Sequence, residues 1–383
     1  MIVDVVMISR SVYEWDIRVR REARALASAG HRVTFIGLPS SVTSDGNITL
    51  IGLGEPSNPQ RTYQRPRSPW YRLGRWMLLP EHRERVEQRF QREVLETAIA
   101  LDLDADVIHA HDFPALEPAI QLSRQIGAKV VYDSHEYWAG RPRRGRPEPW
   151  RRVRRLKREA ELARQADAVI MVSEHGAELM AMKLGLAHVH VVRNTFSTRD
   201  DLVAPTQPTG AVYAGRIAPQ RDLDTVFDAR IWREPGMALH VMGQVDDVKI
   251  PEWVVRHPMG SMESVDLLLI RVGIGLVTMT NKYINHRIAL PNKLFQSISV
   301  GVPVVAADTP QTAVVVREHG LGELYEPGNT ASLEQAVRSV IDNYESFRTN
   351  VADARPLFDW SVDATRLVEL YGDLERSGQR RRG

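Results

Sequence analysis

The segment LPNKLFQSISVGVPVVA at residues 290–306 places a turn, a helix and an apolar run in immediate succession. A turn at Pro291 opens a helix that we predict over residues 292–300 and that ends at Gly301. The run Val302–Ala306 is short and apolar throughout, which is typical of a strand buried on both faces of a parallel sheet. A helix that leads straight into such a strand predicts an α/β fold.

The same alternation of apolar runs and amphipathic patterns continues on both sides of this segment. In the carboxy-terminal half, the predicted elements are the strands Ala211–Tyr213, Ala238–Met242 and Ile274–Val277 and the helices Leu223–Ala229, Ser332–Tyr344 and Ser361–Leu374. In the amino-terminal half, they are the strands Ile2–Ser9, Arg32–Gly37, Asp106–His109, Lys129–Tyr132 and Ala168–Val172 and the helices Arg18–Ala29 and Glu81–Leu101. Strands that alternate with helices indicate parallel sheets covered by helices on both faces.

The length of 383 residues favours two domains. The polar stretch Asp200–Gly210 contains two prolines and has no apolar period, so we predict that it links them. This places an amino-terminal domain at residues 1–199 and a carboxy-terminal domain at residues 211–360, with a helix in residues 361–383 that returns to the first domain. The predicted architecture is two Rossmann-like, doubly wound α/β domains that face each other across a cleft, with the ligand at the carboxyl ends of the strands.

The composition excludes several kinds of protein and site. The chain has no cysteine, which rules out disulfides, thiolate catalysis and cysteine-based metal sites and is typical of a cytoplasmic protein. The amino terminus lacks the pattern of a signal peptide, and no segment approaches about 18 uncharged apolar residues. The formal net charge is only +2, so nucleic acid is not an expected partner. No pattern indicates the oligomeric state.

Two segments place positive charge beside the end of a predicted strand. The strand that ends at Tyr213 is followed by Gly215, which allows a close approach of the backbone to a ligand. Arg216 and Arg221 come next, and a helix is expected from Asp222. Fixed cations together with the amides of a helix N-terminus are what a pyrophosphate requires. The alternative interpretation is an ordinary strand-to-helix turn with surface arginines.

The second of these segments is Leu290–Ala306, which was quoted at the start. Its helix carries Lys293 in the first turn and Gln296 one turn further on. Lys293 adds a cation near a helix N-terminus, and the amide of Gln296 is a candidate partner for a ribose hydroxyl. The alternative is only a capped helix of an ordinary parallel fold.

Five segments, which follow one another along nearly the whole chain, resemble the retaining glycosyltransferases of family four, whose fold is named GT-B. They lie within Asp16–Val33, Asp106–Asp112, Val131–Trp138, Gly215–Arg216 and Leu290–Ala306. Any one of them is a weak signal, whereas the ordered set is specific. The Leu-Pro-Asn-Lys sequence of the last segment is similar to a subgroup of this family.

The resemblance implies donor contacts in the carboxy-terminal domain and acceptor contacts in the amino-terminal domain. Catalytic contacts to the departing diphosphate or the donor sugar are implied for Arg216, Arg221 and His111. Further donor contacts are implied for Gly215, Leu290, Asn292, Lys293 and Gln296. Acceptor contacts are implied for Asp16, His135 and Glu136.

The implied reaction moves a sugar from a nucleoside-diphosphate sugar, most often UDP- or GDP-linked, to a small molecule or a lipid-linked glycan with retention of configuration. The nucleotide sugar is a co-substrate, so no separate cofactor is expected. No metal is expected either, since cations of the protein stabilise the departing diphosphate.

The sequence departs from the family pattern in three places. Arg221 stands where the family usually has lysine, and the family's paired glutamates correspond to Ile288 and Gln296. The first strand is followed by Ser-Arg-Ser-Val-Tyr and not by a glycine-rich loop. These departures motivate an alternative function, a catalytically degenerate subunit that binds a nucleotide sugar or serves a partner.

The remaining polar motifs have structural interpretations. The aspartates of Asp102–Asp106 precede a strand as a surface turn, and those of Asp222–Asp224 cap a helix, so neither group is expected to bind a metal. We expect His109 and His111 to alternate across their strand, with one packed inside and the other, His111, facing the cleft.

Two stretches are rich in basic and aromatic residues. Residues 141–158 hold ten basic side chains and one acidic side chain, with Trp138 and Trp150 close by, and Pro69–Leu79 adds further arginines and aromatics. Such stretches suit an anionic membrane surface or an anionic acceptor. The alternative is a solvated helix face. The expected location is therefore cytoplasmic, with membrane association as an open alternative.

Overall fold

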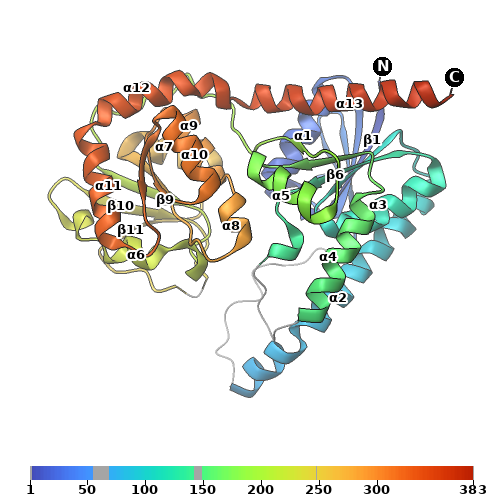
Figure 1. The fold of residues 1–383 in the computed structure, drawn as a ribbon, viewed down its shortest axis with the longest axis horizontal. Helices are drawn as coiled ribbons and strands as arrows, with labels where there is room; N and C mark the ends of the chain where they lie inside the picture. Colours follow the sequence, from blue (N-terminus) through green and yellow to red (C-terminus); the bar gives the residue numbers. More distant parts are fainter. Residues whose placement is uncertain (1, 55–68, 142–148, 247, 383) are drawn as a thin grey trace. The chain divides into compact units, whose positions relative to one another are not determined.

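The computed structural model describes residues 2–54, 69–141, 149–246 and 248–382. They form two compact α/β units, each with helices on both faces of a sheet (Figure 1). The first unit falls within residues 1–172, 176–192 and 364–383, and the second comprises residues 173–175 and 193–363. The prediction of two Rossmann-like α/β domains is confirmed.

The first unit is built on an eight-stranded sheet with the order β3-β4-β2-β1-β5-β6-β7-β8. Its strands are β1 (Asp4–Val12), β2 (Arg32–Leu38), β3 (Ser44–Asp45), β4 (Ile48–Gly52), β5 (Val107–His111), β6 (Lys129–Ser134), β7 (Ala168–Met171) and β8 (His190–Val191). Neighbouring strands are parallel except for β3 and β4. The strand order reverses between β1 and β5, and ligands of open α/β sheets bind at the carboxyl ends of strands at such a reversal.

The helices of the first unit follow from capping residues and apolar periodicity. They are α1 (Ile17–Ser28), α2 (Pro69–Ala100), α3 (Phe113–Ile126), α4 (Pro149–Ala163), most of α5 (Glu174–Leu184) and most of α13 (Trp360–Arg382), with the short 3-10 turns η1 (Tyr13–Trp15) and η3 (Trp138–Gly140). Asp16 caps α1, because its carboxylate accepts a hydrogen bond of 3.2 Å from the amide of Val19. The buried face of α1 then repeats every three to four residues through Val19, Ala23 and Leu26.

The second unit contains a parallel sheet with the order β11-β10-β9-β12-β13-β14, which is the strand order of the Rossmann fold. Its strands are β9 (Gly210–Ala214), β10 (Ala238–Met242), β11 (Val255–His257), β12 (Gly273–Val277), β13 (Val304–Ala307) and β14 (Gly322–Tyr325). Its helices are α6 (Leu223–Asp228), α7 (Met262–Val272), α8 (Ile284–Ile288), α9 (Asn292–Ser299), α10 (Pro310–His319), α11 (Thr330–Asp342) and α12 (Tyr344–Ala354), with the 3-10 turns η4 (Pro219–Arg221), η5 (Arg230–Arg233) and η6 (Arg355–Phe358).

The core of the second unit has two sides because side chains alternate along each strand. On β9, Ala211 and Tyr213 point into the cluster that contains residues of α6 and α11. Val212 between them points into the cluster that contains residues of α7. The opening segment of the sequence forms α9 and β13 as predicted in type, although the helix ends at Ser299 and the strand begins at Val304.

The predicted linker, residues 200–210, lies within the second unit. The backbone amide of Arg199 donates to the Ser299 carbonyl at 3.0 Å, and the Arg199 guanidinium pairs with Asp201 and Asp266. Ala204 is buried against residues of α7. The chain passes between the units earlier, at residues 192–193. The polar composition of the stretch reflects a surface segment tied down by backbone and ionic contacts, which composition does not reveal.

Candidate active site

In the second unit, the end of β9 lies beside the first turn of α9. Gly215 follows β9 with a φ of 134°, a value that favours glycine. A Cβ atom at this position would lie 3.0 Å from Nζ of Lys293, so the missing side chain leaves room for that amine. Nζ also lies 4.7 Å from the ring centre of Tyr213, within the range of a cation–π contact. The site is therefore shaped to bring a lysine amine to the carboxyl end of β9.

Lys293 and Arg221 have no counter-charge in the part of the chain that the structure describes, where neither side chain makes a hydrogen bond or an ion pair. Burial, and then the neighbouring charge of Arg221, lower the pKa of Lys293 to about 7. Two cations that lie close together without carboxylates are poised for an anionic ligand, because a phosphate would satisfy both of them.

Arg216 is held at the strand end by contacts within the protein. Its guanidinium forms an ion pair with the buried carboxylate of Asp246, while 55% of its side chain remains exposed. The hydroxyl of Tyr213 donates to the backbone carbonyl of Arg216 at 2.7 Å. The backbone and the charged group of Arg216 are thus both fixed at the strand end, which is the arrangement that makes an electrostatic contact useful in catalysis.

The helix expected from Asp222 contributes less than predicted. It begins at Leu223 but has only six residues, so its dipole is small. Asp222 makes no capping hydrogen bond to it, and its carboxylate accepts hydrogen bonds from the hydroxyl of Tyr325 at 2.9 Å and the amide of Gly328 at 3.2 Å. The structural interpretation of Asp222 is confirmed, but it holds a neighbouring loop and does not cap the helix.

The other aspartate motif is also structural. Asp106 accepts a hydrogen bond of 2.9 Å from the backbone amide of Asp4, and Asp104 accepts one of 3.0 Å from the amide of Ala105. A turn at residues 101–102 precedes β5, as the sequence predicted, and the Asp106 carboxylate ties this stretch to the start of β1.

The predicted donor residues of α9 fall into three environments. Asn292 is the exposed first residue of the helix. Leu290 is buried in a hydrophobic cluster, so its side chain serves packing. Gln296 is buried as well, and its Nε2 donates to a carboxylate oxygen of Asp266 at 2.8 Å and to the Met262 carbonyl at 3.3 Å. The amide nitrogen of Gln296 is already occupied, and its contact with a ribose stays a prediction.

The two histidines of β5 lie on the same side of the strand, and the expectation that they alternate was wrong. Residues two apart in a strand share a face. The rings of His109 and His111 stack with centres 4.4 Å apart, and both side chains are buried. Nδ1 of His109 bonds the hydroxyl of Tyr371 at 2.8 Å, and burial places the pKa of His109 well below its usual value. His111 is therefore covered in this structure, and its contact with a donor sugar stays a prediction.

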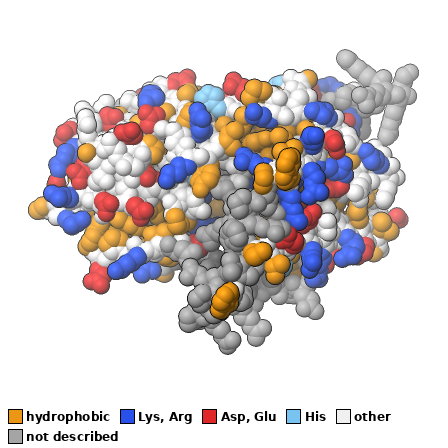
Figure 2. All heavy atoms as spheres, turned by 60° about the horizontal axis from the view of Figure 1, so that its bottom comes forward, with side chains coloured by type: hydrophobic (Ala, Val, Ile, Leu, Met, Phe, Trp, Pro, Cys, Tyr) orange, Lys and Arg blue, Asp and Glu red, His pale blue; other side chains and the backbone are white. Residues whose placement is uncertain are grey.

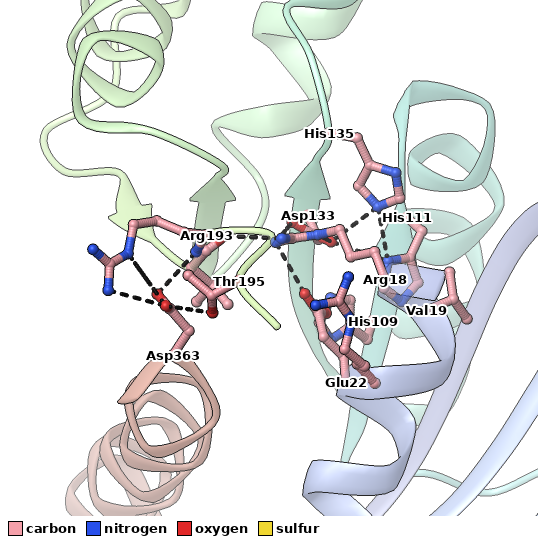
Figure 3. Close-up of polar contacts among 12 residues, drawn as sticks. Arg18, Val19, Glu22, His109, His111, Asp133, His135, Arg193, Thr195 and Asp363 are labelled. Carbon is pink, nitrogen blue, oxygen red and sulfur yellow. Dashed lines mark hydrogen bonds and ion pairs between the residues drawn. The ribbon is translucent and has the colours of Figure 1, made fainter. Parts of the chain in front are cut away.

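These two histidines contact a buried network of charged side chains (Figure 3). The Arg18 guanidinium binds both carboxylate oxygens of Asp133, at 2.6 and 2.7 Å, and lies 2.9 Å from Glu22. Burial alone would raise the pKa of Asp133, but the charges of Arg18 and His135 hold it well below its usual value. Burial raises the pKa of Glu22 to about 7.

Possible metal-ligand atoms of Glu22, His109, His111 and Asp133 lie within 4.8 Å of one another. The guanidinium of Arg18 already binds both carboxylates and takes the place that a cation would occupy. We therefore interpret the group as an ion-pair network.

His135 is the histidine of this network that reaches the surface, with 21% of its side chain exposed. Its Nε2 lies 3.1 Å from a carboxylate oxygen of Asp133, and its Nδ1 lies 3.7 Å from one of Asp112. Burial would lower the pKa of His135, but these two carboxylates outweigh it and raise the pKa to about 10. His135 is therefore a cation at the carboxyl end of β6.

The other two predicted acceptor residues lie in structural contacts. Asp16 caps α1, as described above. Glu136 forms an ion pair of 2.6 Å with Arg141. Their contacts with an acceptor stay predictions.

Four charged residues of the two sites were not singled out from the sequence, namely Arg18, Glu22, Asp112 and Asp246. The pattern around Arg18 offered a signal, because Arg18 and Glu22 lie four residues apart on the face of α1 that also carries Val19 and Ala23. Charges on a buried helix face require partners. The pairing of Arg216 with Asp246, thirty positions apart, had no such local signal.

Comparison with known proteins agrees with this geometry. Residues 16–195 match the glycosyl transferase 4-like domain family. The chain is 24% identical over 301 residues to the glycogen synthase of Mycobacterium tuberculosis strain H37Rv, covering 70% of this chain and 68% of that protein. Its fold is similar to that of the sucrose-phosphate synthase from Thermosynechococcus elongatus, with a TM-score of 0.74, 16% identity and coverage of 98% and 99% of the two chains. The HepE protein of Anabaena, solved with UDP-glucose, gives a TM-score of 0.69 at 14% identity, with 97% and 100% covered.

The match of residues 16–195 and the likeness to the mycobacterial glycogen synthase define the class of enzyme, and the two Rossmann-like units give its fold. The chain is a glycosyltransferase of the GT-B type, as the sequence predicted.

Proposed function

We propose that this glycosyltransferase takes its sugar from a nucleoside-diphosphate sugar bound at the second unit, and that it transfers the sugar with retention and without a metal. The observation that carries the proposal is the pair of cations without counter-charge, Arg221 and Lys293, beside the fixed Arg216. A diphosphate supplies the counter-charge that Arg221 and Lys293 lack, and it lies within reach of the exposed part of Arg216.

The proposed chemistry follows from where charge develops. The bond between the anomeric carbon and the diphosphate oxygen breaks with its electron pair on the oxygen. The acceptor oxygen bonds the same carbon from the same face, and its proton passes to the departing phosphate. Arg216, Arg221 and Lys293 stabilise the charge on that phosphate, which is the role that a metal ion would otherwise fill.

The donor is proposed to be UDP- or GDP-linked, with a hexose or a related sugar. Support comes from HepE, which was solved with UDP and with UDP-glucose. The acceptor is proposed to be a small molecule or a lipid-linked glycan.

A thermal-shift comparison of UDP, GDP, ADP and TDP tests the donor. A ligand at a hundred times its Kd stabilises the folded state by about 2.7 kcal/mol, so the preferred nucleotide is expected to raise Tm by several degrees. The same nucleotide should lose this effect on the Arg221→Ala variant, because one of the two uncompensated cations is gone. The absence of a shift with all four nucleotides would contradict the proposed donor site.

A second candidate function is a subunit that binds a nucleotide sugar without turnover. The observation that favours it is the inward amide of Gln296, which bonds Asp266 at a position where the family has a glutamate. Slow release of nucleoside diphosphate from the donor in water supports the enzyme. Tight binding of the donor without release supports the subunit.

We also propose that the first unit docks to an anionic membrane surface. None of the described helices is long and apolar enough to cross a membrane, so the contact would be peripheral. Trp70 and Trp150 expose 81% and 83% of their side chains near the starts of α2 and α4. Met77, Leu78 and Val153 are exposed as well. Trp150 adjoins Arg151, which pairs with Glu81 and Glu84 of α2, so the start of α4 lies beside α2.

The basic stretch has two parts. Arg151 and Arg158 are neutralised by acids of α2 and α3, whereas Arg152, Arg154 and Lys157 are exposed. Residues 142–148 of the stretch lie outside the described residues. Figure 2 shows apolar and basic side chains next to one another on one face of the molecule. Exposed tryptophans beside cations are typical of proteins that bind anionic lipid headgroups.

Vesicle flotation tests this surface. The protein is expected to float with vesicles of phosphatidylglycerol and phosphatidylcholine, several-fold less with phosphatidylcholine alone, and less as salt rises. The Trp70→Ala/Trp150→Ala variant should lose most of the bound fraction. The matched control is Trp15→Ala, which removes an exposed tryptophan at another place in the same unit. Equal flotation with neutral and anionic vesicles, or none at low salt, would contradict the proposal.

A further inference from the structure

Asp112 has an unusual backbone conformation at the carboxyl end of β5. Its φ of 62° and ψ of 163° lie in a region that glycine adopts readily and other residues rarely do. Asp222, which also has a positive φ, lies in the left-handed helical region that aspartate tolerates. The conformation of Asp112 is held by two backbone hydrogen bonds, from its amide to the Asp133 carbonyl at 2.8 Å and from the Ala115 amide to its carbonyl at 3.1 Å.

The side chain of Asp112 does not cap the helix that follows it. Asp112 immediately precedes α3, but its carboxylate makes no capping hydrogen bond to that helix. One oxygen accepts a hydrogen bond of 3.2 Å from the backbone amide of His135, and the other lies 3.7 Å from Nδ1 of the same histidine. The strained backbone thus turns a carboxylate away from a helix end and towards His135.

The other nitrogen of His135 is occupied from the opposite side. Nε2 lies 3.1 Å from Asp133, whose carboxylate is anchored by Arg18, and 3.3 Å from Nδ1 of His111. The negative charges of these two carboxylates, one on each side of the ring, favour the doubly protonated imidazolium form of His135. The distance of 3.7 Å from Nδ1 to Asp112 is too long for a hydrogen bond, so this N–H remains free to donate to a ligand oxygen.

We propose that Asp112 is a positioning residue that keeps His135 doubly protonated, so that His135 donates a hydrogen bond to an oxygen of the acceptor and does not act as a base. The inference rests on the proposed function, because it assigns the acceptor to the carboxyl end of β6. It also leaves the departing phosphate as the group that receives the acceptor proton. The charged groups that face His135 are Asp112, Asp133, Arg18 and Glu22, with His111 as the neighbouring ring.

The proton state of His135 can be read without knowing the acceptor. In protein labelled with ¹⁵N at histidine, long-range ¹H–¹⁵N spectra distinguish imidazolium from neutral imidazole, and His135→Gln identifies the signal. Wild-type His135 is expected to stay an imidazolium from pH 6 to about pH 9. In Asp112→Asn its midpoint should fall by at least one pH unit. Asp112→Gly should behave in the same way, and glycine adopts this backbone without strain, which protects the fold.

The control is Asp102→Asn, which changes an aspartate with a φ of 47° just ahead of β5 and should leave His135 unchanged. A second readout is the rate of donor hydrolysis between pH 6.5 and pH 9. At saturating donor, where the bound diphosphate keeps Lys293 charged, the rate should be flat for wild type and fall with rising pH for Asp112→Asn, and His135→Gln should abolish that difference. An unchanged His135 midpoint in both Asp112 variants, or a loss of rate that is equal at every pH, would overturn the positioning role. If no donor hydrolysis occurs at all, the proposed function fails while the spectra still decide the role of Asp112.

Discussion

Replacement of Arg216 by alanine is expected to lower turnover by about two to three orders of magnitude, as for the loss of one preorganised donor to a developing oxyanion. The guanidinium is fixed by Asp246, and its backbone is fixed by Tyr213, so little reorganisation is needed when the diphosphate departs. Release of nucleoside diphosphate from the donor, with and without an acceptor, measures this effect. Because the contact strengthens in the transition state, kcat should fall more than KM rises.

Two further variants separate this role from a general effect of charge. Arg256→Ala removes an exposed arginine from β11 of the same unit and should leave turnover unchanged. Arg216→Lys keeps the charge but loses the planar guanidinium, so its turnover should lie between those of wild type and Arg216→Ala. Near-normal turnover of Arg216→Ala in a folded protein would remove Arg216 from the mechanism.

Replacement of Lys293 by methionine is expected to weaken binding of the nucleoside diphosphate by about 10- to 100-fold, the usual value of a charge-assisted hydrogen bond. The wild-type complex should also take up a proton as it forms. The pKa of Lys293 is lowered to about 7, so the free amine is mostly neutral at pH 8, and a bound phosphate restores its charge. Calorimetry in buffers of different ionisation enthalpy should detect about one proton at pH 8, and affinity should fall as pH rises above 7.

The folded protein without ligand should respond in the opposite direction. Folding lowers the pKa of Lys293, so below about pH 7 the charged lysine lowers the free energy of unfolding. This destabilisation disappears as the pH rises from about 7 towards the ordinary pKa of lysine. Lys293→Met should therefore raise Tm at pH 6.5 while it weakens nucleotide binding. Lys282→Met, which changes an exposed lysine of the same unit, should do neither. If proton uptake persists in Lys293→Met, the titrating group is not this lysine.

The fold was predictable wherever an apolar run had clear ends. The bounds predicted for β10, Ala238–Met242, match the structure, because a polar turn lies on either side of the run. The helix α3 was not predicted at all, since its prolines at positions 114 and 118 disguise a helix that buries Leu116 and Ile120. Pro114 lies in the first turn, where a helix tolerates proline.

The site residues were predictable only in part, because those of the second unit lie in local motifs whereas those of the first unit are brought together from distant parts of the sequence. Gly215, Arg216 and Lys293 lie in short motifs next to strand or helix ends, so local sequence indicated them, and the structure places Lys293 over Gly215. The first unit's site joins Arg18 to Asp133, 115 positions away. Such a pair is created by the parallel sheet and leaves no local pattern in either segment.

The helix α13 has a consequence for how the protein is made. Leu367, Tyr371 and Leu374 are buried within the first unit, and Tyr371 bonds His109. Residues 193–363, which make up nearly all of the second unit, leave the ribosome as one continuous stretch. The first unit must wait for residues 364 onwards before its core can close. We therefore expect the first unit, although most of it is translated first, to complete its folding after the second unit.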